Sequence, residues 1–361
     1  MSIAATELSV VHYRSFGEYS LVLDPHVTVL VGRNAVGKTN LVEALQLLTS
    51  GASFRKPTAS ELLQEGAGRG RAVLALEGEG RLIEMGLELA EGKRSFVRNG
   101  KRTTAAGVRG VLPSVLFCPD DLDMVKRSAS ARRGALDSFG VQLNAQYAKL
   151  LSAYERTVEQ RNSLLREGPS AGLLEVWDES LAQTGAQLLM HRTALLERIR
   201  EHFVEVYRAI APHEQPDVAY VPTVGTLAAT RDGVAEQFAR ALAERREDEL
   251  RRGLTLVGPH RDEIAFTIDG RSARDFGSQG QQRSIVLAWK IAEVQVTRDI
   301  LGRPPLLLLD DVMSELDASR REAIMGFVAN EIQTVITTTN LGYFSDEILR
   351  RASIVRVGPE A

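Results

Sequence analysis

The sequence lacks the features that mark disulfide-bonded, secreted or membrane-spanning proteins. Its one cysteine, Cys118, cannot form a disulfide within the chain, which is typical of a reducing compartment. The longest apolar run, residues 304–309, is far shorter than the ~20 residues of a membrane-spanning helix. The first residues have neither a basic segment nor an apolar core, so no signal peptide is expected. We therefore expect a cytoplasmic protein with no membrane partner.

An overall excess of positive charge is also missing, since the formal net charge is −3. The composition of the 361 residues, 44% apolar and 25% charged, is that of a globular protein and excludes a disordered or fibrous chain. The charge is uneven: residues 51–133 have 15 Lys and Arg against 10 Asp and Glu, and residues 299–361 have 6 against 10. This distribution permits a basic face beside an acidic catalytic one.

The N-terminal part predicts strands at 21–23 and 27–31, a glycine-bearing loop and a helix that begins near Lys38. Short apolar runs over residues 71–103, with an Asn99-Gly100 turn, predict an antiparallel sheet attached to this core. From residue 135 to residue 210 the apolar residues recur with the period of about 3.6 residues that is typical of a helix. One apolar stripe over 139–158 and a second over 177–210, separated by a Gly/Pro break, predict an antiparallel helical arm.

The strand pattern returns at 263–268, 306–309, 335–338 and 354–357, with a helix over 279–299. Continuous apolar strands that alternate with helices predict a parallel sheet covered on both faces. The expected fold is therefore an α/β head with a mixed sheet, split by an inserted α-helical arm. We expect the head in residues 1–125 and 249–361, and the arm in residues 126–248.

Residues 32–39 match the phosphate-binding pattern G-x-x-x-x-G-K-[ST], in which glycines let backbone N–H groups approach phosphates. The expected nucleotide-binding residues are Gly32, Arg33, Asn34, Ala35, Val36, Gly37, Lys38 and Thr39. In this pattern the lysine reaches the β- and γ-phosphates and the threonine hydroxyl binds Mg²⁺. Its position between a strand and a helix predicts a nucleotide site.

Two carboxylates follow the apolar strand 306–309. Ligands of open α/β sheets bind at the carboxyl ends of the strands, so Asp310 is expected to hold Mg²⁺ and Asp311 to orient or deprotonate the attacking water. An acidic turn after a core strand is the alternative for this run taken alone. The phosphate loop favours the functional interpretation.

Ser278, followed three residues later by Gln281, predicts a capping box at the start of the 279–299 helix. Capping is its simplest role, but a serine at a helix N-terminus also suits anion binding. In chain order, residues 32–39, 278–282, 309–311 and 314–317 resemble the Walker A, signature, Walker B and D-loop motifs of ABC-type ATPases. That resemblance implies ATP and Mg²⁺ as cofactors, catalytic roles for Lys38, Asp311 and Ser278, and two heads that enclose two ATP molecules. Ser278, Gly280 and Gln281 would then contact the partner's nucleotide.

More narrowly, the chain resembles the RecF family of bacterial recombination mediators, in the SMC-like branch of these ATPases. The most specific stretches are Gly-Pro-His-Arg-Asp at 258–262 and Asp-Asp-Val-Met-Ser-Glu-Leu-Asp at 310–317. The other matching stretches are 13–16, 37–44, 116–122, 154–156, 160–162 and 278–283. The resemblance implies an ATP-dependent homodimeric clamp in DNA repair, recombination, replication and the SOS response. It also implies binding at double-strand/single-strand junctions of gaps, and RecA loading with RecR and RecO on the nucleoid.

We expect a weak, DNA-dependent ATPase, and three departures from the ABC pattern favour slow hydrolysis that acts as a switch. Asp311 stands where a glutamate is usual, no glutamine lies near Pro119, and no histidine follows strand 335–338. Two alternatives stay open. A transporter's nucleotide-binding subunit is disfavoured by the arm and the missing histidine, and a small SMC-like chromosome organiser by the short arm.

DNA contacts are expected from clusters of cations, because phosphate neutralisation requires them. The predicted hairpin near residue 99 carries five cations and no acid between residues 93 and 102, although a solvated hairpin face is the simpler explanation. The candidates are Arg55, Lys56, Lys93, Arg94, Arg98, Lys101 and Arg102, with Lys126, Arg127, Arg132 and Arg133 as further ones. No base-reading motif is present, so recognition by structure and not by sequence is expected.

Overall fold

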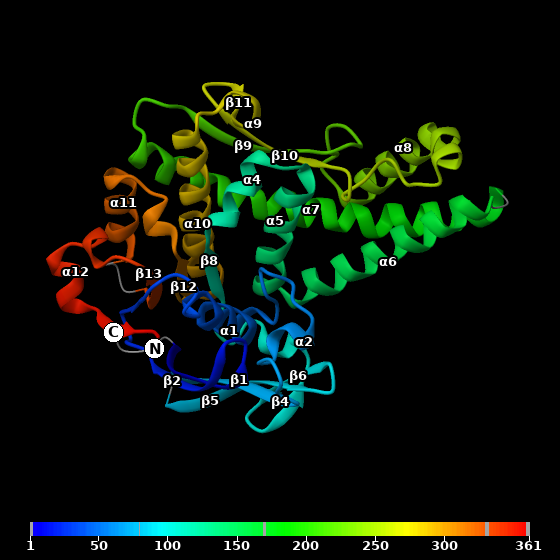
Figure 1. Cartoon of the computed structure of the whole chain (residues 1–361). Coiled ribbons are helices and arrows are strands. Elements are labelled where there is room, and N and C mark those ends of the chain that lie inside the picture. Colours follow the sequence, from blue (N-terminus) through cyan, green and yellow to red (C-terminus); the bar gives the residue numbers. More distant parts are fainter. Residues whose placement is uncertain (1–2, 79, 169–170, 329–331, 359–361) are drawn as a thin grey trace. The chain divides into compact units, whose positions relative to one another are not determined.

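The computed structural model describes residues 3–78, 80–168, 171–328 and 332–358 (Figure 1). The chain forms two compact units. The head unit comprises Met1–Asp121 and Leu287–Ala361, and the arm unit comprises Leu122–Val286. The division expected from the sequence, with boundaries after residues 125 and 248, partitions the chain differently and stays a prediction.

A five-stranded parallel sheet lies in the head unit, with the order β14-β3-β13-β12-β8. Its strands are β3 (Val27–Val31), β8 (Ser114–Phe117), β12 (Leu306–Asp310), β13 (Thr334–Thr338) and β14 (Ser353–Arg356). The apolar runs at 27–31, 306–309, 335–338 and 354–357 are thus confirmed as strands. Strand β8 was not predicted, because its four residues show no period of their own.

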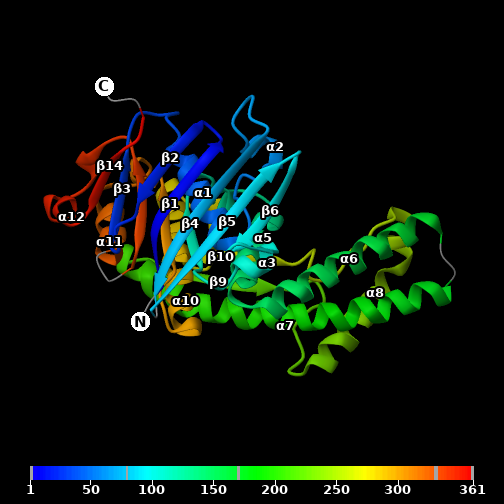
Figure 2. The ribbon, with the colours of Figure 1, turned by 90° about the horizontal axis from the view of Figure 1, so that it is seen from below.

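A second, antiparallel sheet completes the head unit, with the order β2-β1-β4-β5-β6-β7, and confirms the attached sheet (Figure 2). Its strands are β1 (Ala4–Tyr13), β2 (Phe16–Val22), β4 (Arg69–Gly78), β5 (Arg81–Ala90), β6 (Lys93–Arg98) and β7 (Lys101–Thr103). The predicted turn at Asn99-Gly100 joins β6 to β7, and both residues have positive φ, of 49° and 73°. Two left-handed residues match the right-handed twist of the strands they connect.

Helix α1 (Lys38–Ser50) contacts strands of both head sheets. Its Leu41, Leu45 and Leu48 are fully buried in one core with leucines of β1, β4 and β12. This burial fixes the start of the helix, and hence the phosphate loop before it, against two layers. The other helices of the head are α2 (Ala59–Leu62), α3 (Ala105–Val108), α11 (Ala318–Val328) and α12 (Asp346–Arg351), with short 3₁₀ turns at Pro119–Leu122, Val312–Ser314 and Leu341–Tyr343. Helix α10 (Gln279–Leu301) begins in the arm unit and ends in the head unit.

The arm unit is mainly helical. Its helices are α4 (Asp123–Lys126), α5 (Ala129–Leu143), α6 (Ala145–Glu167), α7 (Ala171–Ile210), α8 (Arg231–Arg252) and α9 (Ala273–Phe276). Helices α6 and α7 pack side by side as the predicted helical hairpin, and α8 packs against α7 (Figures 1 and 2). Helix α8 and the strand β9 (Pro216–Val221) were not predicted.

Two predictions about the arm unit are wrong. The apolar stripe over 139–158 is not one helix, because Asn144 leaves the helical conformation and its side chain accepts hydrogen bonds from the N–H groups of Gln146 and Tyr147, which caps α6. Strand β10 (Glu263–Ile268) does not join the parallel sheet. It pairs antiparallel with β9 and with β11 (Arg271–Ser272), and its residues alternate between buried and half-buried, as expected of such a sheet.

Among the residues that the structure describes, no helix is long and apolar enough to cross a membrane.

Candidate nucleotide site and its surroundings

The phosphate loop connects β3 to α1 and needs glycine at both ends. Gly37 has a φ of 105°, and a Cβ there would lie 2.6 Å from the Phe16 ring. A Cβ on Gly32 would lie 2.4 Å from the Val357 carbonyl oxygen. A side chain at Gly32 would collide with the backbone, and one at Gly37 would be strained by its φ and would displace the Phe16 ring, so both positions favour glycine. Arg33, Asn34 and Ala35, between the glycines, are exposed.

Lys38, the first residue of α1, is a buried cation held by neutral groups. Its Nζ donates hydrogen bonds to the carbonyl oxygens of Gly32 at 2.8 Å and Arg33 at 2.9 Å. The residue is only 6% exposed and, among the described residues, it has no ion pair within 4 Å. Burial lowers the pKa of Lys38, while the charges of Asp311 and Asp310 oppose this shift. The ammonium group is therefore pre-positioned in the loop, and no carboxylate neutralises it.

Asp310 ends β12 beside the phosphate loop and is also buried. Its Oδ1 accepts hydrogen bonds from the Thr39 hydroxyl at 3.1 Å and the Thr337 hydroxyl at 2.8 Å. Burial raises the pKa of Asp310, and the hydrogen bonds from Thr337 and Thr39 partly offset the shift. The structure thus brings together the lysine, the threonine and the first aspartate that the motifs predicted.

Thr337 is a site residue that the sequence analysis did not single out. It lies opposite Asp310 in the parallel pairing of β13 with β12, and its hydroxyl also accepts the backbone N–H of Asp311 at 2.9 Å. This bond holds Asp311 in a left-handed conformation with a φ of 53°. The half-buried Asp311 side chain is therefore fixed by its backbone at the strand end. The signal available was the row of threonines that ends the 335–338 strand.

The donor set fits a magnesium ion. The Thr39 hydroxyl and the Asp310 carboxylate are hard oxygen ligands, and Mg²⁺ is usually held by one or two such protein groups together with phosphates and water. Within the described ranges there is no group of three or more His, Cys, Asp or Glu side chains that would form a metal site of protein ligands alone.

A second network beside the loop centres on Glu43, which the analysis of motifs did not single out. Glu43 is fully buried on α1 and accepts two hydrogen bonds of 2.9 Å from Arg14 and one of 2.6 Å from Ser53. Arg55, expected to contact DNA, lies 3.6 Å from Glu43 and donates to Asn40 at 2.9 Å. Part of the Arg55 guanidinium is therefore engaged within the head unit.

Near Pro119, where the ABC pattern has a glutamine, this chain has an internal ion pair. Asp121 accepts the backbone N–H of Cys118 at 2.8 Å and pairs with Lys290 at 3.1 Å. Burial alone would lower the pKa of Lys290, but Asp121 and Glu293 reverse this effect and raise it. Asp120, by contrast, is exposed. Of these two neighbours, Asp120 is the one whose carboxylate faces solvent.

Ser278 lies in the arm unit, at the exposed N-terminus of α10. The predicted capping box is confirmed: the Ser278 hydroxyl accepts the Gln281 N–H at 3.2 Å, and the Gln281 side chain accepts the Ser278 N–H at 2.8 Å. Gln281 also donates to Glu214 at 3.0 Å. The serine is thus held with its side chain at a helix N-terminus, where an anion is favoured.

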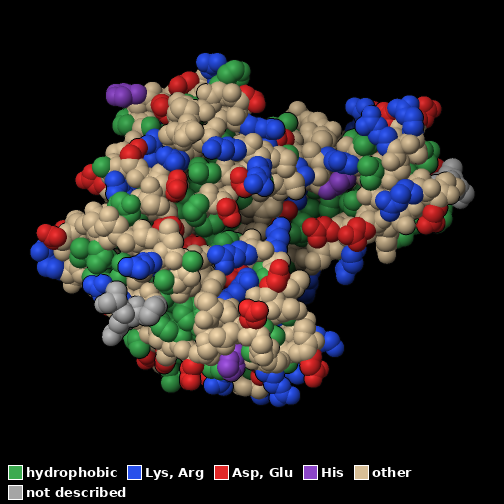
Figure 3. Space-filling view, in the orientation of Figure 1, with side chains coloured by type: hydrophobic (Ala, Val, Ile, Leu, Met, Phe, Trp, Pro, Cys, Tyr) green, Lys and Arg blue, Asp and Glu red, His purple; other side chains and the backbone are tan. Residues whose placement is uncertain are grey.

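The predicted basic hairpin is present, and its five cations, together with Lys56, are exposed. Figure 3 shows basic side chains interspersed with acidic ones over the part of the surface where Figure 1 labels β4 and β6. Two of the further candidates are engaged in bonds within the arm unit, and their expected contact with DNA stays a prediction. Arg132 is buried in an ion pair of 2.6 Å with Glu263, and Arg133 donates to the Asp262 carbonyl oxygen at 2.6 Å.

Comparison with known proteins places this site in a family. Residues 4–354 match the model of the family described as RecF/RecN/SMC N terminal domain. The chain is 39% identical over 365 residues to the DNA replication and repair protein RecF of Heliobacterium modesticaldum (strain ATCC 51547 / Ice1), covering 99% of this chain and 97% of that one. It is 37% identical over 353 residues to the protein of the same name from Gloeobacter violaceus (strain ATCC 29082 / PCC 7421), covering 96% and 94%.

Solved structures agree with the sequence relatives. A structure described as the recombination mediator protein RecF-ATPrS in the RecFOR pathway superposes with a TM-score of 0.88 at 29% identity, over 95% of this chain and 94% of that one. The Smc head domain of Pyrococcus furiosus has a TM-score of 0.59 at 15% identity, over 99% and 94%, and shares the fold. The expected α/β head of mixed sheets with a helical insertion is thereby confirmed. By sequence over nearly its whole length and by fold, the chain belongs to the RecF family, whose named relatives are DNA replication and repair proteins.

Proposed function

We propose that the chain is a DNA-repair ATPase that binds Mg²⁺-ATP and closes as a homodimer on DNA. The observation that carries the proposal is the meeting of Lys38, Thr39, Asp310 and Asp311 at one edge of the parallel sheet. A relative described as RecF-ATP, 30% identical over 94% of each chain with a TM-score of 0.86, supports ATP as the nucleotide.

The chemistry follows from the local geometry. Lys38 exchanges the carbonyl oxygens of Gly32 and Arg33 for phosphate oxygens, which bear full negative charge and bind an ammonium more strongly than carbonyl dipoles do. Thr39 and Asp310 would hold Mg²⁺, which neutralises phosphate charge. Asp311 orients or deprotonates the attacking water. Because an aspartate reaches less far than the usual glutamate, we expect slow hydrolysis that resets a switch.

Dimerisation supplies the remaining part of the site. Ser278 is exposed and fixed by its capping box, so it is available to the γ-phosphate bound by a second copy of the chain. Replacing Ser278 by Arg should leave ATP affinity unchanged and prevent ATP-dependent dimerisation, measured by light scattering after size-exclusion chromatography. An S278R chain that still dimerises with ATP would contradict the sandwich.

DNA is the expected macromolecular ligand, bound at double-strand/single-strand junctions of gaps. The exposed cations of the β6–β7 hairpin, together with Lys56, would neutralise backbone phosphates, which requires no base reading. By family resemblance, RecR is the direct partner, RecO and RecA act with it, and the nucleoid is the site of action. The RecFOR pathway is named for a related structure.

Fluorescence anisotropy of a labelled gapped duplex tests this function. We expect tight binding with a slowly hydrolysed ATP analogue, weak binding without it, and a steep loss of affinity with salt. A matched titration with the Lys38→Met chain should give only the weak mode. If the protein binds nucleotide but the nucleotide leaves DNA binding unchanged, the clamp is wrong and a protein partner or a transporter-type role has to be considered.

A small SMC-like chromosome organiser is the second candidate, favoured by the fold shared with an Smc head. In that case contacts between arms would hold two chains together without nucleotide. Light scattering in the absence of ATP distinguishes the two, since only the organiser gives a dimer there.

A further inference from the structure

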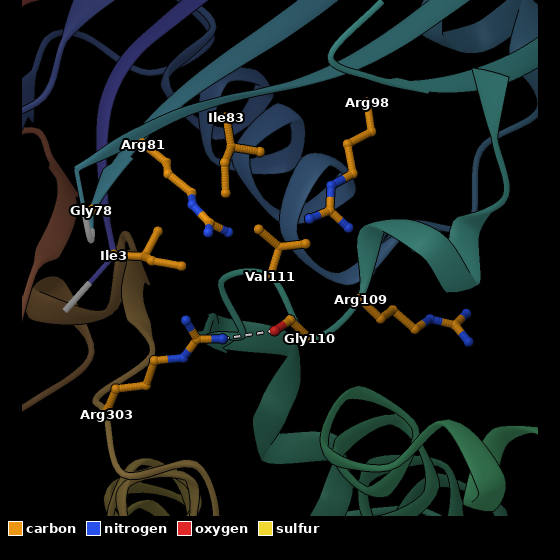
Figure 4. A pocket seen from close by; sticks show the side chains of 9 residues that line it. All are labelled: Ile3, Gly78, Arg81, Ile83, Arg98, Arg109, Gly110, Val111 and Arg303. Carbon is orange, nitrogen blue, oxygen red and sulfur yellow. Dashed lines mark hydrogen bonds between the residues drawn. The ribbon is translucent and has the colours of Figure 1, made fainter. Parts of the chain in front are cut away.

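A cavity in the head unit is lined by four arginines and does not include the phosphate loop. Its volume is about 330 Å³, and it lies where β1, β4 and β5 begin or end, bordered by the segments that follow α3 and α10 (Figure 4). The lining residues are Ile3, Gly78, Arg81, Ile83, Arg98, Arg109, Gly110, Val111 and Arg303. Among the residues that the structure describes, no acidic one lines it.

Three of the arginines point toward the cavity. Arg81 and Ile83 lie on one face of β5, and Arg98 shares that face because it pairs with Met85 two residues further along the strand. Arg303 is fixed on the opposite wall, where its Nη2 donates to the Gly110 carbonyl oxygen at 2.8 Å. In Figure 4 the guanidinium groups of Arg81, Arg98 and Arg303 surround Val111.

The fourth arginine has a different role. Arg109 points away from the cavity in Figure 4, and its Nε donates to the Ser50 carbonyl oxygen at 3.0 Å. It anchors the segment that carries Gly110 and Val111, and so indirectly holds the wall on which Arg303 rests. Burial lowers the pKa of Arg109.

The positive charge of the cavity favours the binding of an anion. Across the described part of the chain, none of the three inward arginines has a carboxylate within ion-pair distance. Like charges that share a concave site raise its positive potential, which a bound anion neutralises. Guanidinium forks match the oxygens of phosphate, and three cations suit a group that bears more than one negative charge, whereas a carboxylate bears one.

The size and the lining of the cavity restrict the class of ligand that it can hold. A volume of about 330 Å³ is at the lower end for small-molecule sites and is too small for a continuous duplex backbone. Ile3, Ile83 and Val111 give the cavity apolar walls against which an organic group can pack. We propose that this cavity is a second phosphate-binding site, for the terminal phosphate or diphosphate of a compact organic ligand. Such a group occurs on a free nucleotide and at the end of a nucleic-acid strand, and the proposal does not depend on the function proposed above.

Calorimetric titration of the full-length Lys38→Ala chain with inorganic pyrophosphate tests the site, because this change disables the phosphate loop. We expect binding that weakens about tenfold or more in Arg81→Ala and in Arg98→Ala, since each change removes a charge-assisted hydrogen bond. Arg71→Ala is the matched control, because Arg71 is exposed on β4 of the same sheet and does not line the cavity. Its affinity should stay within twofold, and thermal unfolding should confirm that each variant is folded.

Competition then identifies the source of the phosphate. Displacement of pyrophosphate by AMP indicates a free nucleotide. Displacement by a short oligonucleotide only when it carries a terminal phosphate indicates a strand end, and either result supports the site. Absence of pyrophosphate binding, equal weakening in Arg71→Ala, or stronger displacement by an aspartate-rich peptide than by any phosphate would overturn the proposal.

Discussion

Buried charges are held in opposite ways at the candidate nucleotide site of the head unit and in the arm unit. In the head unit, Lys38 is held by backbone carbonyl groups and Asp310 by two threonine hydroxyls. In the arm unit, buried Arg161 lies between two carboxylates, with Asp178 at 2.7 Å and Glu249 at 2.6 Å, and also donates to the Thr255 hydroxyl at 2.9 Å. The first arrangement uses neutral dipoles and the second uses opposite charges.

The difference corresponds to a difference in role, because one arrangement can bind a ligand and the other stabilises the fold. Charges that neutralise each other, as Arg161 and its carboxylates do, leave little field for a third group, so their network is complete within the fold. A charged group held only by neutral dipoles is not neutralised, so it can still attract a ligand of opposite charge. Its burial nevertheless costs desolvation free energy. The pKa shifts of Lys38 and Asp310, both away from the charged form because of burial, reflect that cost. An anion and a cation of the right size would relieve it.

The arm unit repeats its pattern at a second place. Arg192 pairs with Asp137 at 2.7 Å and donates to the Pro259 carbonyl oxygen at 2.5 Å, while Tyr147 donates to the same aspartate at 2.6 Å. These bonds tie α5, α6 and α7 to the segment that carries Gly258. We infer that the arm depends on such pairs for stability more than the nucleotide site does.

The largest expected effect is on the arm. Replacing Arg161 by Ala leaves Asp178 and Glu249 buried without their cation, which should lower the free energy of unfolding by about 3–5 kcal/mol. Denaturant titration followed by circular dichroism measures the change. Arg156→Ala is the matched control on the same helix, because Arg156 is exposed, and it should change stability by at most about 0.5 kcal/mol. Equal effects of the two changes would remove the contrast between the arm unit and the candidate nucleotide site.

A pH dependence should arise from His260. Burial lowers the pKa of His260 to about 4. Its Nε2 donates to the Thr255 carbonyl oxygen at 3.1 Å, and its Nδ1 accepts the Tyr154 hydroxyl at 2.7 Å. The unfolded chain binds this proton near pH 6.5, so the stabilisation is complete above that pH and is lost as the pH falls toward 4. The expected loss is about 1.4 kcal/mol per pH unit in this window.

Denaturant titrations at pH 7, 6 and 5 test this dependence, with His260→Gln as the variant and His26→Gln as the control. His26 is exposed, so its replacement should leave the slope unchanged, whereas the His260 variant should have a shallower one. The same slope in all three chains would show that His260 does not resist protonation.

Replacing Lys38 by Met should affect binding and not stability. The change removes the charged donor for the phosphates, and a hydrogen bond to a charged group is worth roughly 1.5–3 kcal/mol, so ATP affinity should fall by about ten- to a hundredfold or more. Because only neutral carbonyls lose their partner, unfolding should change much less than in Arg161→Ala. Calorimetry with ATP and parallel denaturant titrations measure both quantities. Undiminished affinity would contradict the assignment of the phosphate loop.

The candidate nucleotide site was predictable because each of its two motifs is contiguous in the chain. Residues 32–39 carry their own geometry, and Asp310 follows an apolar strand that is buried on both faces. Thr337 was not predictable in the same way, since its bond to Asp310 depends on the register of two strands. Glu43 is similar: its partners Arg14 and Ser53 come from other segments, and nothing in its local sequence indicates burial.

The errors in the fold have the same origin. The 263–268 strand has the composition of a core strand, but it pairs with β9, which lies more than 40 residues earlier. The stripe over 139–158 has helical spacing throughout, and yet Asn144 breaks it, because its side chain caps one helix at the position where another ends. Periodicity shows which face of a segment is apolar, whereas pairing partners and caps are decided by tertiary contacts.

The smallest expected effect on stability is at Ser278, an exposed polar residue of the arm unit. Replacing Ser278 by Ala removes the cap of α10 and should lower stability by about 1 kcal/mol, while Ser278→Thr, which keeps the hydroxyl, should lower it less. Denaturant titration measures this difference. If Ser278→Arg costs no more stability than Ser278→Ala and yet abolishes the ATP-dependent dimer, its effect lies at the contact with the second chain and not in the fold. A loss of several kcal/mol in Ser278→Ala would instead make the serine part of the arm's structural network.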